Sequence, residues 1–354
     1  MIMNLHTCWL TLNRSCNLRC KWCYAQDSKF DKKYNMNLPV AKSLIDICIG
    51  NSVRNFILIG GEPTLHNNFF EIIEYIIDKD CEVTVVTNGI KLSSKSICDR
   101  LKLFDKDKFS FSISLKGATN FDYHNNCGNA IFSKVLKCIE NCKKNDWKYS
   151  LSYVISSESI DNIEIFARQV RESGIVDTIG FSYCCDILTR EGDFFPNNAI
   201  HLIEIDKTLS KKYEILSDIL QNKFSLHQVL PLCMCDKKMF DEMTTQKQVY
   251  TSCHTHNRTG VIFDTDASIL LCNHFVGYGI GKYNKDYWDT ETFKEYWNSE
   301  NMTNLHNKLI SMPSTKCATC EIASQCGGGC CIQWFSHTFE SYNSKYMTIN
   351  NINN

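Results

Sequence analysis

The sequence predicts an α/β protein whose first half is a partial (βα)6 parallel barrel and whose second half is rich in cysteine. Three observations support this prediction. Apolar runs of strand length alternate with amphipathic helical segments up to about residue 185, which is the pattern of parallel sheets. Two of the runs carry serine at every second position. Cysteine is unusually frequent, with 21 residues among 354.

The six predicted strands are short apolar runs, and most of them end in a turn motif. The segments between them place apolar residues at i, i+3, i+4 and i+7, as in "NFFEIIEYIIDK" and "AIFSKVLKCIENCKK", which predicts helices packed on a sheet. The predicted strands cover residues 9–13, 56–61, 83–89, 109–115, 149–155 and 178–184.

The serine pattern favours a barrel over a flat, doubly wound sheet. In the fourth run, Ser110, Ser112 and Ser114 share one face, and the fifth run repeats this with Ser150 and Ser152. Strands covered by helices on both faces are apolar throughout. A serine face opposite the helices therefore favours the concave inner surface of an incomplete barrel, with a solvated edge strand as the alternative for either run alone.

Composition argues against several classes of protein. The net charge is −1 and the charges are dispersed, so neither a nucleic-acid partner nor an anionic membrane surface is expected. The opening residues lack the apolar segment of a signal peptide, and no run is long enough to cross a bilayer. We therefore expect a cytoplasmic protein, in which abundant thiols indicate metal ligands, redox chemistry or small buried side chains.

Four regions are predicted along the chain. Residues 1–190 form the barrel, and residues 191–240 form a helical linker region that begins at a polar, turn-rich stretch. Residues 241–340 form the cysteine-rich domain, which is expected to fold around a bound group because it has few periodic segments. Residues 341–354, ending in "TINNINN", are expected to be disordered.

The first cysteine motif directly follows the first predicted strand. Cys16, Cys20 and Cys23 have the spacing Cx3Cx2C, which leaves disulfides, a zinc site and an iron–sulfur cluster to be weighed. Zinc sites close a tetrahedron with four ligands, whereas a cubane 4Fe–4S cluster held by three thiolates keeps one iron free for a small chelating ligand. Three unrelated structural cysteines are the remaining alternative.

Three further motifs follow the ends of later strands. "GGEP" begins at Gly60, "TNG" begins at Thr87 and "SLKG" begins at Ser114. Loops at the carboxyl ends of parallel barrel strands hold the active sites of such folds. Paired glycines also allow backbone amides to approach a ligand closely. Together with the cysteine loop, these motifs predict one site for a small ligand at this end of the barrel.

This set of motifs resembles the radical S-adenosylmethionine (SAM) enzymes over roughly residues 5–185. The resemblance implies that Cys16, Cys20 and Cys23 ligate a 4Fe–4S cluster, whose free iron binds the amino and carboxylate groups of SAM. One electron from the cluster would cleave SAM to a 5′-deoxyadenosyl radical, which abstracts a hydrogen atom. The implied SAM contacts are Gly60, Gly61, Glu62 and Pro63 for the amino group, Trp22 and Tyr24 for adenine, and Asn88, Ser114 and Lys116 for ribose and carboxylate.

The second cysteine field lies near the end of the chain. Cys317, Cys320, Cys326 and Cys330 have the spacing Cx2Cx5Cx3C, and Cys253 and Cys272 lie upstream, eighteen residues apart. This pattern resembles the SPASM extension, an auxiliary iron–sulfur domain of radical SAM maturases. A zinc ribbon shares the Cx2C element and is the alternative.

The resemblance to SPASM domains implies one or two auxiliary 4Fe–4S clusters. Cys253, Cys272 and Cys330 would belong to the first, and Cys317, Cys320 and Cys326 to the second. Nothing after Cys331 supplies the final cysteine of a complete SPASM pattern, so each set lacks a ligand. The nearest spare thiols are Cys233, Cys235 and Cys331.

Three other cysteines lie on the predicted active-site side. Cys127 belongs to the segment after the fourth strand, and Cys184 and Cys185 end the sixth. One of them is a candidate donor of a hydrogen atom to a substrate radical, although buried cysteines often serve only as small apolar side chains.

The resemblance implies that the protein modifies a residue of a ribosomally made peptide by crosslinking, epimerisation or oxidation. Its partners would be that peptide or protein and a low-potential electron donor, flavodoxin or ferredoxin. The alternative enzyme is an anaerobic sulfatase maturase, in which an aspartate base stands where this chain has Asn273. A non-catalytic iron–sulfur protein is the alternative of another class, and it would have no need of the "GGEP" motif.

Overall fold

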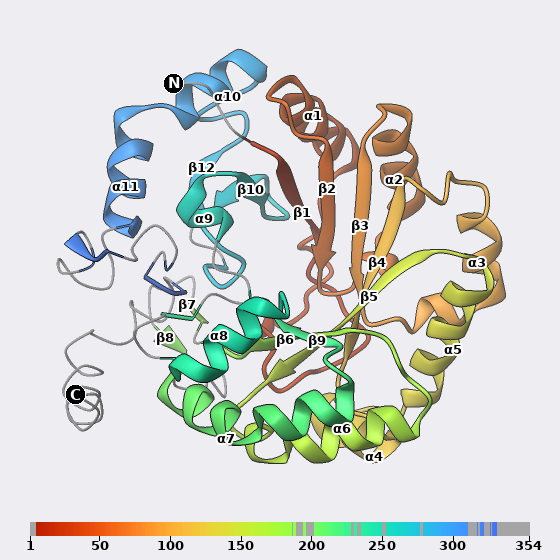
Figure 1. Ribbon diagram of the computed structural model, residues 1–354. Helices are drawn as coiled ribbons and strands as arrows, with labels where there is room; N and C mark the ends of the chain where they lie inside the picture. The colour runs from red at the N-terminus through yellow and green to blue at the C-terminus, as the bar shows by residue number, and fades with distance from the viewer. Residues whose placement is uncertain are drawn as a thin grey trace.

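The computed structural model describes most of the chain (Figure 1). Cys233, Cys331 and the predicted tail lie outside the described residues, as do residues 191–193, 196–201, 228–229 and 232–234 of the predicted linker region. The described residues are 5–185, 187–188, 194–195, 202–227, 230–231, 235–249, 253–276, 279–310, 317, 319–321, 326 and 328–330.

A single curved sheet organises the described part of the chain. Its strand order is β12-β11-β10-β1-β2-β3-β4-β5-β6-β9, and β1 to β6 run parallel, each beside the next. The predicted partial parallel barrel is thereby confirmed, with six strands in sequence order. The bounds are β1 Thr7–Asn13, β2 Asn55–Gly60, β3 Glu82–Thr87, β4 Phe109–Leu115, β5 Lys148–Ile155, β6 Ile179–Tyr183, β9 Phe224–Leu226, β10 Gly260–Phe263, β11 Ser268–Leu270 and β12 Gly279–Lys282.

Helices cover the outer face of the barrel strands (Figure 1). Helix α2 shows why, because its buried residues Phe69, Ile72, Ile73 and Ile76 recur at helical spacing and form one apolar face. The bounds are α1 Leu38–Gly50, α2 Phe69–Asp78, α3 Lys95–Leu101, α4 Asn120–Cys127, α5 Phe132–Lys144, α6 Ile163–Glu172, α7 Leu202–Leu220, α8 Lys237–Thr245, α9 His254–Asn257, α10 Thr290–Trp297 and α11 Glu300–Ile310. Short 3₁₀ helices occupy Gln26–Ser28, Pro63–Leu65, Lys91–Ser93 and Ile160–Asn162, and β7 Ile187–Leu188 pairs with β8 Phe194–Phe195.

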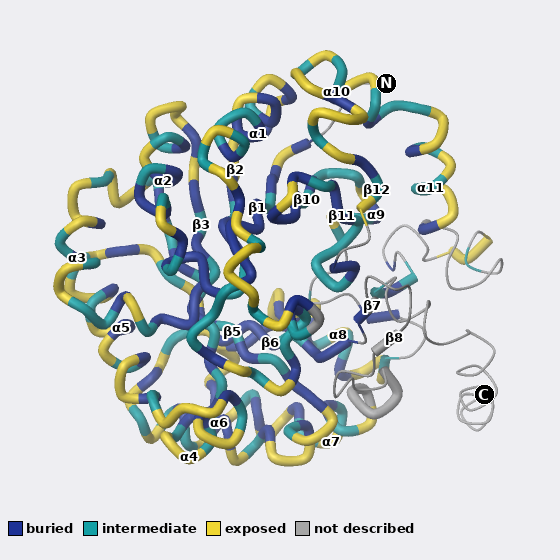
Figure 2. Tube along the Cα trace, turned by 180° about the vertical axis from the view of Figure 1, so that it is seen from behind, coloured by how far each residue is buried: buried dark blue, intermediate teal, exposed yellow. Residues whose placement is uncertain are grey.

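The core lies between the sheet and these helices, where Figure 2 shows the central strands buried and the outer surfaces of the helices exposed. In β4 the apolar residues are buried and the alternating serines are half-buried. The serines of neighbouring strands stand side by side, with Ser114 Oγ 3.3 Å from Ser152 Oγ. The inner face of the barrel is therefore lined by hydroxyl groups.

The cysteine-rich half of the chain extends the same sheet. Strand β10 pairs in parallel with β1, with Thr7 opposite Gly260 and Leu10 opposite Phe263. Strands β11 and β12 continue this edge with antiparallel pairing, while β9 is added beside β6 at the other edge. Residues 260–263 thus lie directly beside the strand that leads into the first cysteine motif. No helix in the described ranges is long and apolar enough to cross a membrane.

Candidate active site

A cavity of about 380 Å³ opens at the carboxyl ends of the barrel strands. Its walls come from the loops after β1, β2, β3 and β4, from the end of β6, and from Asn273 and His274 of the cysteine-rich half. Eleven of the predicted cluster and SAM residues line it together: Cys16, Cys20, Trp22, Cys23, Tyr24, Gly60, Gly61, Glu62, Asn88, Ser114 and Lys116. Pro63 is buried in the 3₁₀ helix behind this wall.

Two of the three thiols of the first motif, Cys16 and Cys23, accept hydrogen bonds from amide groups. The N–H of Leu18 donates to Cys16 Sγ (3.4 Å), and the N–H of Ala25 donates to Cys23 Sγ (3.4 Å). Such donors suit thiolate ligands because they stabilise negative charge on sulfur. Burial raises the pKa of Cys16 to about 11 and that of Cys23 to about 12.

Cys20 differs from its two neighbours. A hydrogen bond from the Cys127 thiol, together with the positive charge of Lys116, lowers the pKa of Cys20 to about 6 against the opposing effect of burial. Among the described residues, no three Cys, His, Asp or Glu side chains converge closely enough to hold a single metal ion. A cubane cluster is larger than one ion, and three separated thiols around one cavity fit it.

The end of helix α4 is joined to the cysteine loop by backbone hydrogen bonds. The N–H groups of Arg19 and Lys21 donate to the carbonyls of Cys127 (3.1 Å) and Asn126 (3.0 Å) at its end. Cys127 is fully buried, and its sulfur lies 2.9 Å from the carbonyl oxygen of Tyr123. Cys127 therefore lies behind Cys20 and outside the lining of the cavity.

The paired glycines of "GGEP" allow β2 to approach the start of the cysteine loop. A Cβ atom on Gly61 would lie 2.3 Å from the carbonyl oxygen of Ser15 and 2.5 Å from that of Arg14. The backbone there is already fixed, because Gly61 N–H donates to Asn13 O (2.8 Å) and Glu62 N–H to Ser15 O (2.9 Å). Only glycine fits at this position without moving the cysteine loop.

The Gly61→Ala substitution is expected to weaken SAM binding about tenfold or more, because overpacking against fixed backbone costs about 1–3 kcal/mol. Anaerobic equilibrium dialysis of reconstituted protein measures this affinity. Gly174→Ala is the control, since a Cβ there would meet nothing within 4 Å and only its positive φ of 83° is unfavourable. Equal SAM affinity in the Gly61 variant and the natural protein would refute the expectation.

Glu62 links the ends of two strands. Its carboxylate is 1 % exposed and accepts from Thr64 Oγ1 (2.6 Å), Thr87 Oγ1 (2.7 Å) and Asn88 N–H (2.8 Å). Burial raises its pKa, while these donors favour the charged form. The linkage orients Asn88, whose side-chain amide donates to Asn17 Oδ1 (2.8 Å) and reaches Cys16 Sγ (3.9 Å).

Aromatic residues form the wall beside the second and third cysteines. The hydroxyl of Tyr24 donates to the carbonyl of Gly60 (3.2 Å), and the Arg14 guanidinium lies 5.7 Å from the centre of its ring. Trp22 is 8 % exposed and lines the same cavity. Flat apolar side chains of this kind suit a purine ring.

His274 also lines the cavity, although the sequence motifs did not predict it there. Its Nδ1 lies 3.5 Å from Cys272 Sγ, and its ring centre is 6.1 Å from that of Tyr24. Burial lowers the pKa of His274 to about 4, so the ring is neutral at physiological pH. Asn273 lies beside it, and its Oδ1 is buried without a hydrogen-bond partner among the described residues. The signal in the sequence was their position directly after Cys272.

The two aspartates near Cys272 in sequence are engaged elsewhere. Asp264 forms a buried ion pair with Arg14 at 2.6 Å, and Asp266 pairs with Lys282 at 2.9 Å on an exposed turn. Neither lines the cavity.

Cys272, one of the predicted auxiliary cysteines, directly precedes Asn273 and His274 of the cavity wall. Burial, with added effects of the nearby Cys330 and Cys253 thiols, raises the pKa of Cys272 to about 12. These three residues, predicted for the first auxiliary cluster, are therefore close in space. Cys317 and Cys320 share one turn, where the N–H of Cys320 donates to Cys317 O (3.2 Å), and Gly329 N–H donates to Cys326 O (3.3 Å).

The two proposed hydrogen donors at the end of β6 face different surroundings. Cys184 lines the cavity, and its thiol lies 4.0 Å from the carbonyl oxygen of Trp22. Cys185 is 1 % exposed, packs in the apolar core and lies outside the cavity lining.

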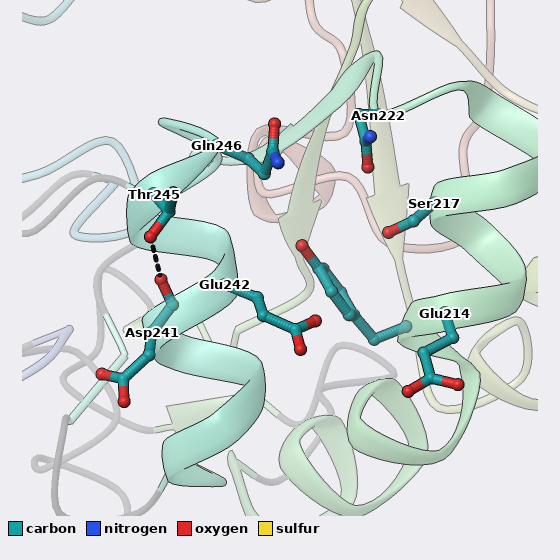
Figure 3. A pocket seen from close by; sticks show the side chains of 8 residues that line it. Glu214, Ser217, Asn222, Asp241, Glu242, Thr245 and Gln246 are labelled. Carbon is teal, nitrogen blue, oxygen red and sulfur yellow. Dashed lines mark hydrogen bonds between the residues drawn. The ribbon is translucent and has the colours of Figure 1, made fainter.

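A second hollow, of about 440 Å³, lies between α7 and α8 (Figure 3). Figure 3 shows Glu214 and Glu242 on the two helices that flank it. The hydroxyl of Tyr213, which also lines the hollow, donates to Gln248 Oε1 (2.8 Å). None of the predicted site residues lines this hollow.

The parallel barrel strands and the thiol-lined cavity at their carboxyl ends define an enzyme that handles a small ligand beside three cysteines. Residues 10–170 match the model of the radical SAM superfamily. The chain therefore contains a radical SAM domain, and members of this superfamily use a 4Fe–4S cluster and SAM.

Two curated relatives match most of the chain. The Fe-coproporphyrin III synthase of Methanosarcina barkeri is 22% identical over 333 residues, which are 90% of this chain and 81% of the relative. The cysteine-type anaerobic sulfatase-maturating enzyme of Clostridium novyi is 20% identical over 333 residues, which are 89% of this chain and 85% of the relative. Against several further relatives the chain spans about half of their length or less.

The fold is also similar to that of a solved structure, SuiB of Streptococcus suis bound to the precursor peptide SuiA. The TM-score is 0.69 at 17% identity, and the likeness covers 95% of this chain and 74% of SuiB. It includes the cysteine-rich half, and the expectation of a radical SAM enzyme with a SPASM-like region is confirmed.

Proposed function

We propose that the protein is a radical SAM peptide maturase that modifies a residue of a ribosomally made peptide. Cys16, Cys20 and Cys23 would ligate the SAM-binding cluster, whose fourth position SAM occupies. When bound, cluster and SAM supply a 5′-deoxyadenosyl radical that removes a hydrogen atom from the substrate. Gly60 and Gly61, which line the cavity, would hold the end of β2 against the cysteine loop at the SAM site. Trp22 and Tyr24 would bind adenine, and Asn88, Ser114 and Lys116 the ribose and carboxylate.

One observation carries the proposal. Asn273 and His274, which directly follow the auxiliary ligand candidate Cys272, line the same cavity as the three thiols of the first motif. A cluster held by Cys272 would therefore lie beside the substrate. It could accept the electron that remains after hydrogen abstraction, as an oxidative modification requires.

The two kinds of product differ in the number of electrons that the substrate loses. A flavodoxin or ferredoxin would supply the one electron that cleavage of SAM requires, with methionine and 5′-deoxyadenosine as the products. In a crosslink or an oxidation, the substrate would then give up one further electron and one proton. In an epimerisation, it would instead receive a hydrogen atom from a thiol, and one electron from the donor protein with one proton would restore that thiol.

Cys184 is the thiol best suited to that donation, because it lines the cavity. Cys185 and Cys127 are less suited, since both are buried outside its lining. The likeness to SuiB supports a peptide substrate, because that protein was solved with a precursor peptide bound.

The test is co-expression with the short peptide encoded beside the gene, in deuterated water, followed by tandem mass spectrometry. Loss of a hydrogen pair supports crosslinking or oxidation, and deuterium at one α-carbon supports epimerisation. In vitro assays compare this peptide with iron coproporphyrin and a sulfatase-derived peptide, since two relatives are named for such chemistry. Modification of iron coproporphyrin alone would overturn the proposal.

An anaerobic sulfatase maturase is the second candidate, favoured by the relative from Clostridium novyi. Asn273 cannot take up a proton as an aspartate does, and Asp264 and Asp266 are held in ion pairs. Formylglycine in the sulfatase-derived peptide, with neighbouring peptides unmodified, would establish this candidate instead.

A further inference from the structure

A half-buried phenylalanine on the cavity wall has no part in the function proposed above. Phe30 lines the cavity together with Leu18, Cys20 and Trp22. It belongs to the segment that follows the first cysteine motif, and no motif in the sequence marks it. An aromatic side chain so close to the three thiols calls for a physical account of what holds it there.

The chain on either side of Phe30 is tied to the cysteine loop. Before it, the side-chain amide of Gln26 donates to the carbonyl of Lys21 (2.6 Å). After it, the N–H of Arg14, at the start of that loop, donates to the carbonyl of Tyr34 (2.9 Å). The position of Phe30 relative to the cavity is therefore fixed from both sides.

The backbone at Phe30 has an unusual conformation. Lys29 and Phe30 have φ angles of 51° and 55°. Two successive residues with side chains rarely adopt this left-handed conformation, because it brings Cβ close to the backbone carbonyl oxygen. The turn places the exposed Lys29 directly before a residue that lines the cavity. Such strained backbone persists where the surrounding contacts hold it, and it is concentrated at functional sites.

Arg19 contacts the ring of Phe30 from the outer side. Its guanidinium lies 4.2 Å from the centre of that ring, within the range of a cation–π interaction. Nη1 of the same guanidinium donates to the carbonyls of Cys16 (2.7 Å) and Leu18 (2.7 Å). Arg19 is exposed, whereas Phe30 is half-buried and lines the cavity. The ring therefore lies between the cavity and a guanidinium on the protein surface.

We propose that Phe30 is a positioning residue that closes the SAM cavity against solvent beside the cysteine loop, and that Arg19 holds its ring in place. The inference rests on the proposed SAM site at Cys16, Cys20 and Cys23, and it is independent of the substrate. Without the ring, solvent would reach the three thiols, and SAM would lose part of the apolar wall of its site.

The first test measures thiol exposure in the full-length protein prepared without iron, so its readout does not depend on activity. Anaerobic labelling with iodoacetamide, followed by peptide mass spectrometry, gives a rate for each cysteine. Phe30→Ala is expected to raise the rates of Cys16, Cys20 and Cys23 about threefold or more, since thiol reactivity follows exposure. Phe30→Leu should raise them less. Arg19→Ala should also raise them, and the double variant should label no faster than Phe30→Ala alone, because both substitutions act through one ring.

Three controls separate this effect from general loosening of the fold. Cys81 is the internal reference, because it is buried in the turn between α2 and β3. Phe121→Ala should label as the natural protein does, since Phe121 is 72 % exposed on α4 and lies outside the cavity lining. At position 29, Lys29→Gly should also leave the rates unchanged, whereas Lys29→Val should raise them, because a β-branched residue disfavours the left-handed conformation.

The second test measures the SAM affinity of the reconstituted protein by anaerobic equilibrium dialysis. Phe30→Ala is expected to weaken SAM binding about fivefold, because an aromatic part of the wall is lost. Equal thiol labelling or equal SAM affinity in Phe30→Ala and the natural protein would overturn the inference, as would a rise in labelling that Cys81 shares in every variant. If the natural protein itself fails to cleave SAM, the proposed function is refuted instead, and the labelling rates still show whether Phe30 closes the cavity.

Discussion

The Cys20→Ala variant is expected to produce no 5′-deoxyadenosine above the background without enzyme. Cys20 has the lowest pKa of the three thiols in its motif, so it is the one most readily present as the thiolate that iron binds. Its loss leaves two thiolates, which cannot hold a cubane with one free iron. The measurement is anaerobic reconstitution, reduction with dithionite and chromatographic detection of 5′-deoxyadenosine and methionine.

Cys81→Ala is the control for this experiment. Cys81 is also buried, but it lies in the turn between α2 and β3, where its thiol donates to the carbonyl of Lys79 (3.5 Å). This variant should retain SAM cleavage. Cleavage that survives Cys20→Ala would exclude Cys16, Cys20 and Cys23 as the ligand set.

The Asp264→Ala variant is expected to be less stable by about 3–5 kcal/mol, because it leaves a buried guanidinium without its partner charge. Arg14 is 0 % exposed and Asp264 is 2 % exposed. Nε and Nη1 of Arg14 already lack hydrogen-bond partners among the described residues. No neighbouring acceptor among those residues therefore compensates for the loss of the Asp264 carboxylate. Urea unfolding of the protein as isolated, followed by circular dichroism, measures the change.

Asp266→Ala is the matched control in the same turn. Its ion pair with Lys282 is solvent-exposed, and exposed pairs contribute about 0–1 kcal/mol. Replacing Arg14 and Asp264 together by methionine and leucine should recover much of the stability, since a buried pair can often be exchanged for apolar side chains. Similar losses in the Asp264 and Asp266 variants would show that the buried pair is not the cause.

The barrel was predictable because its signals are local. Each strand from β1 to β6 is a short apolar run that is followed by a turn. In β4, apolar residues alternate with serines, and this alternation shows which face of the strand is exposed to solvent. The cluster and SAM candidates could be found for the same reason, since they occupy short motifs at strand ends. Burial of Glu62 was not predictable, because Thr87 and Asn88 come from the next strand.

The remaining features depend on contacts between distant parts of the chain. Pairing of β1 with β10 brings together residues about 250 positions apart, and no local pattern specifies it. His274 enters the cavity as a result of that pairing. Cys127 was expected on the active-site side, but the carbonyl contacts of α4 with Arg19 and Lys21 place it behind the cysteine loop.

The pairing of β1 with β10 also sets an order of events during synthesis on the ribosome. One edge of β1 stays unpaired until residues 260–263 have emerged, and an unpaired edge is open to wrong partners. Arg14 likewise lacks its counter-charge until Asp264 is available. We therefore expect the nascent chain to need protection by chaperones until residues 260–264 have emerged, and iron–sulfur assembly factors to act only after that point.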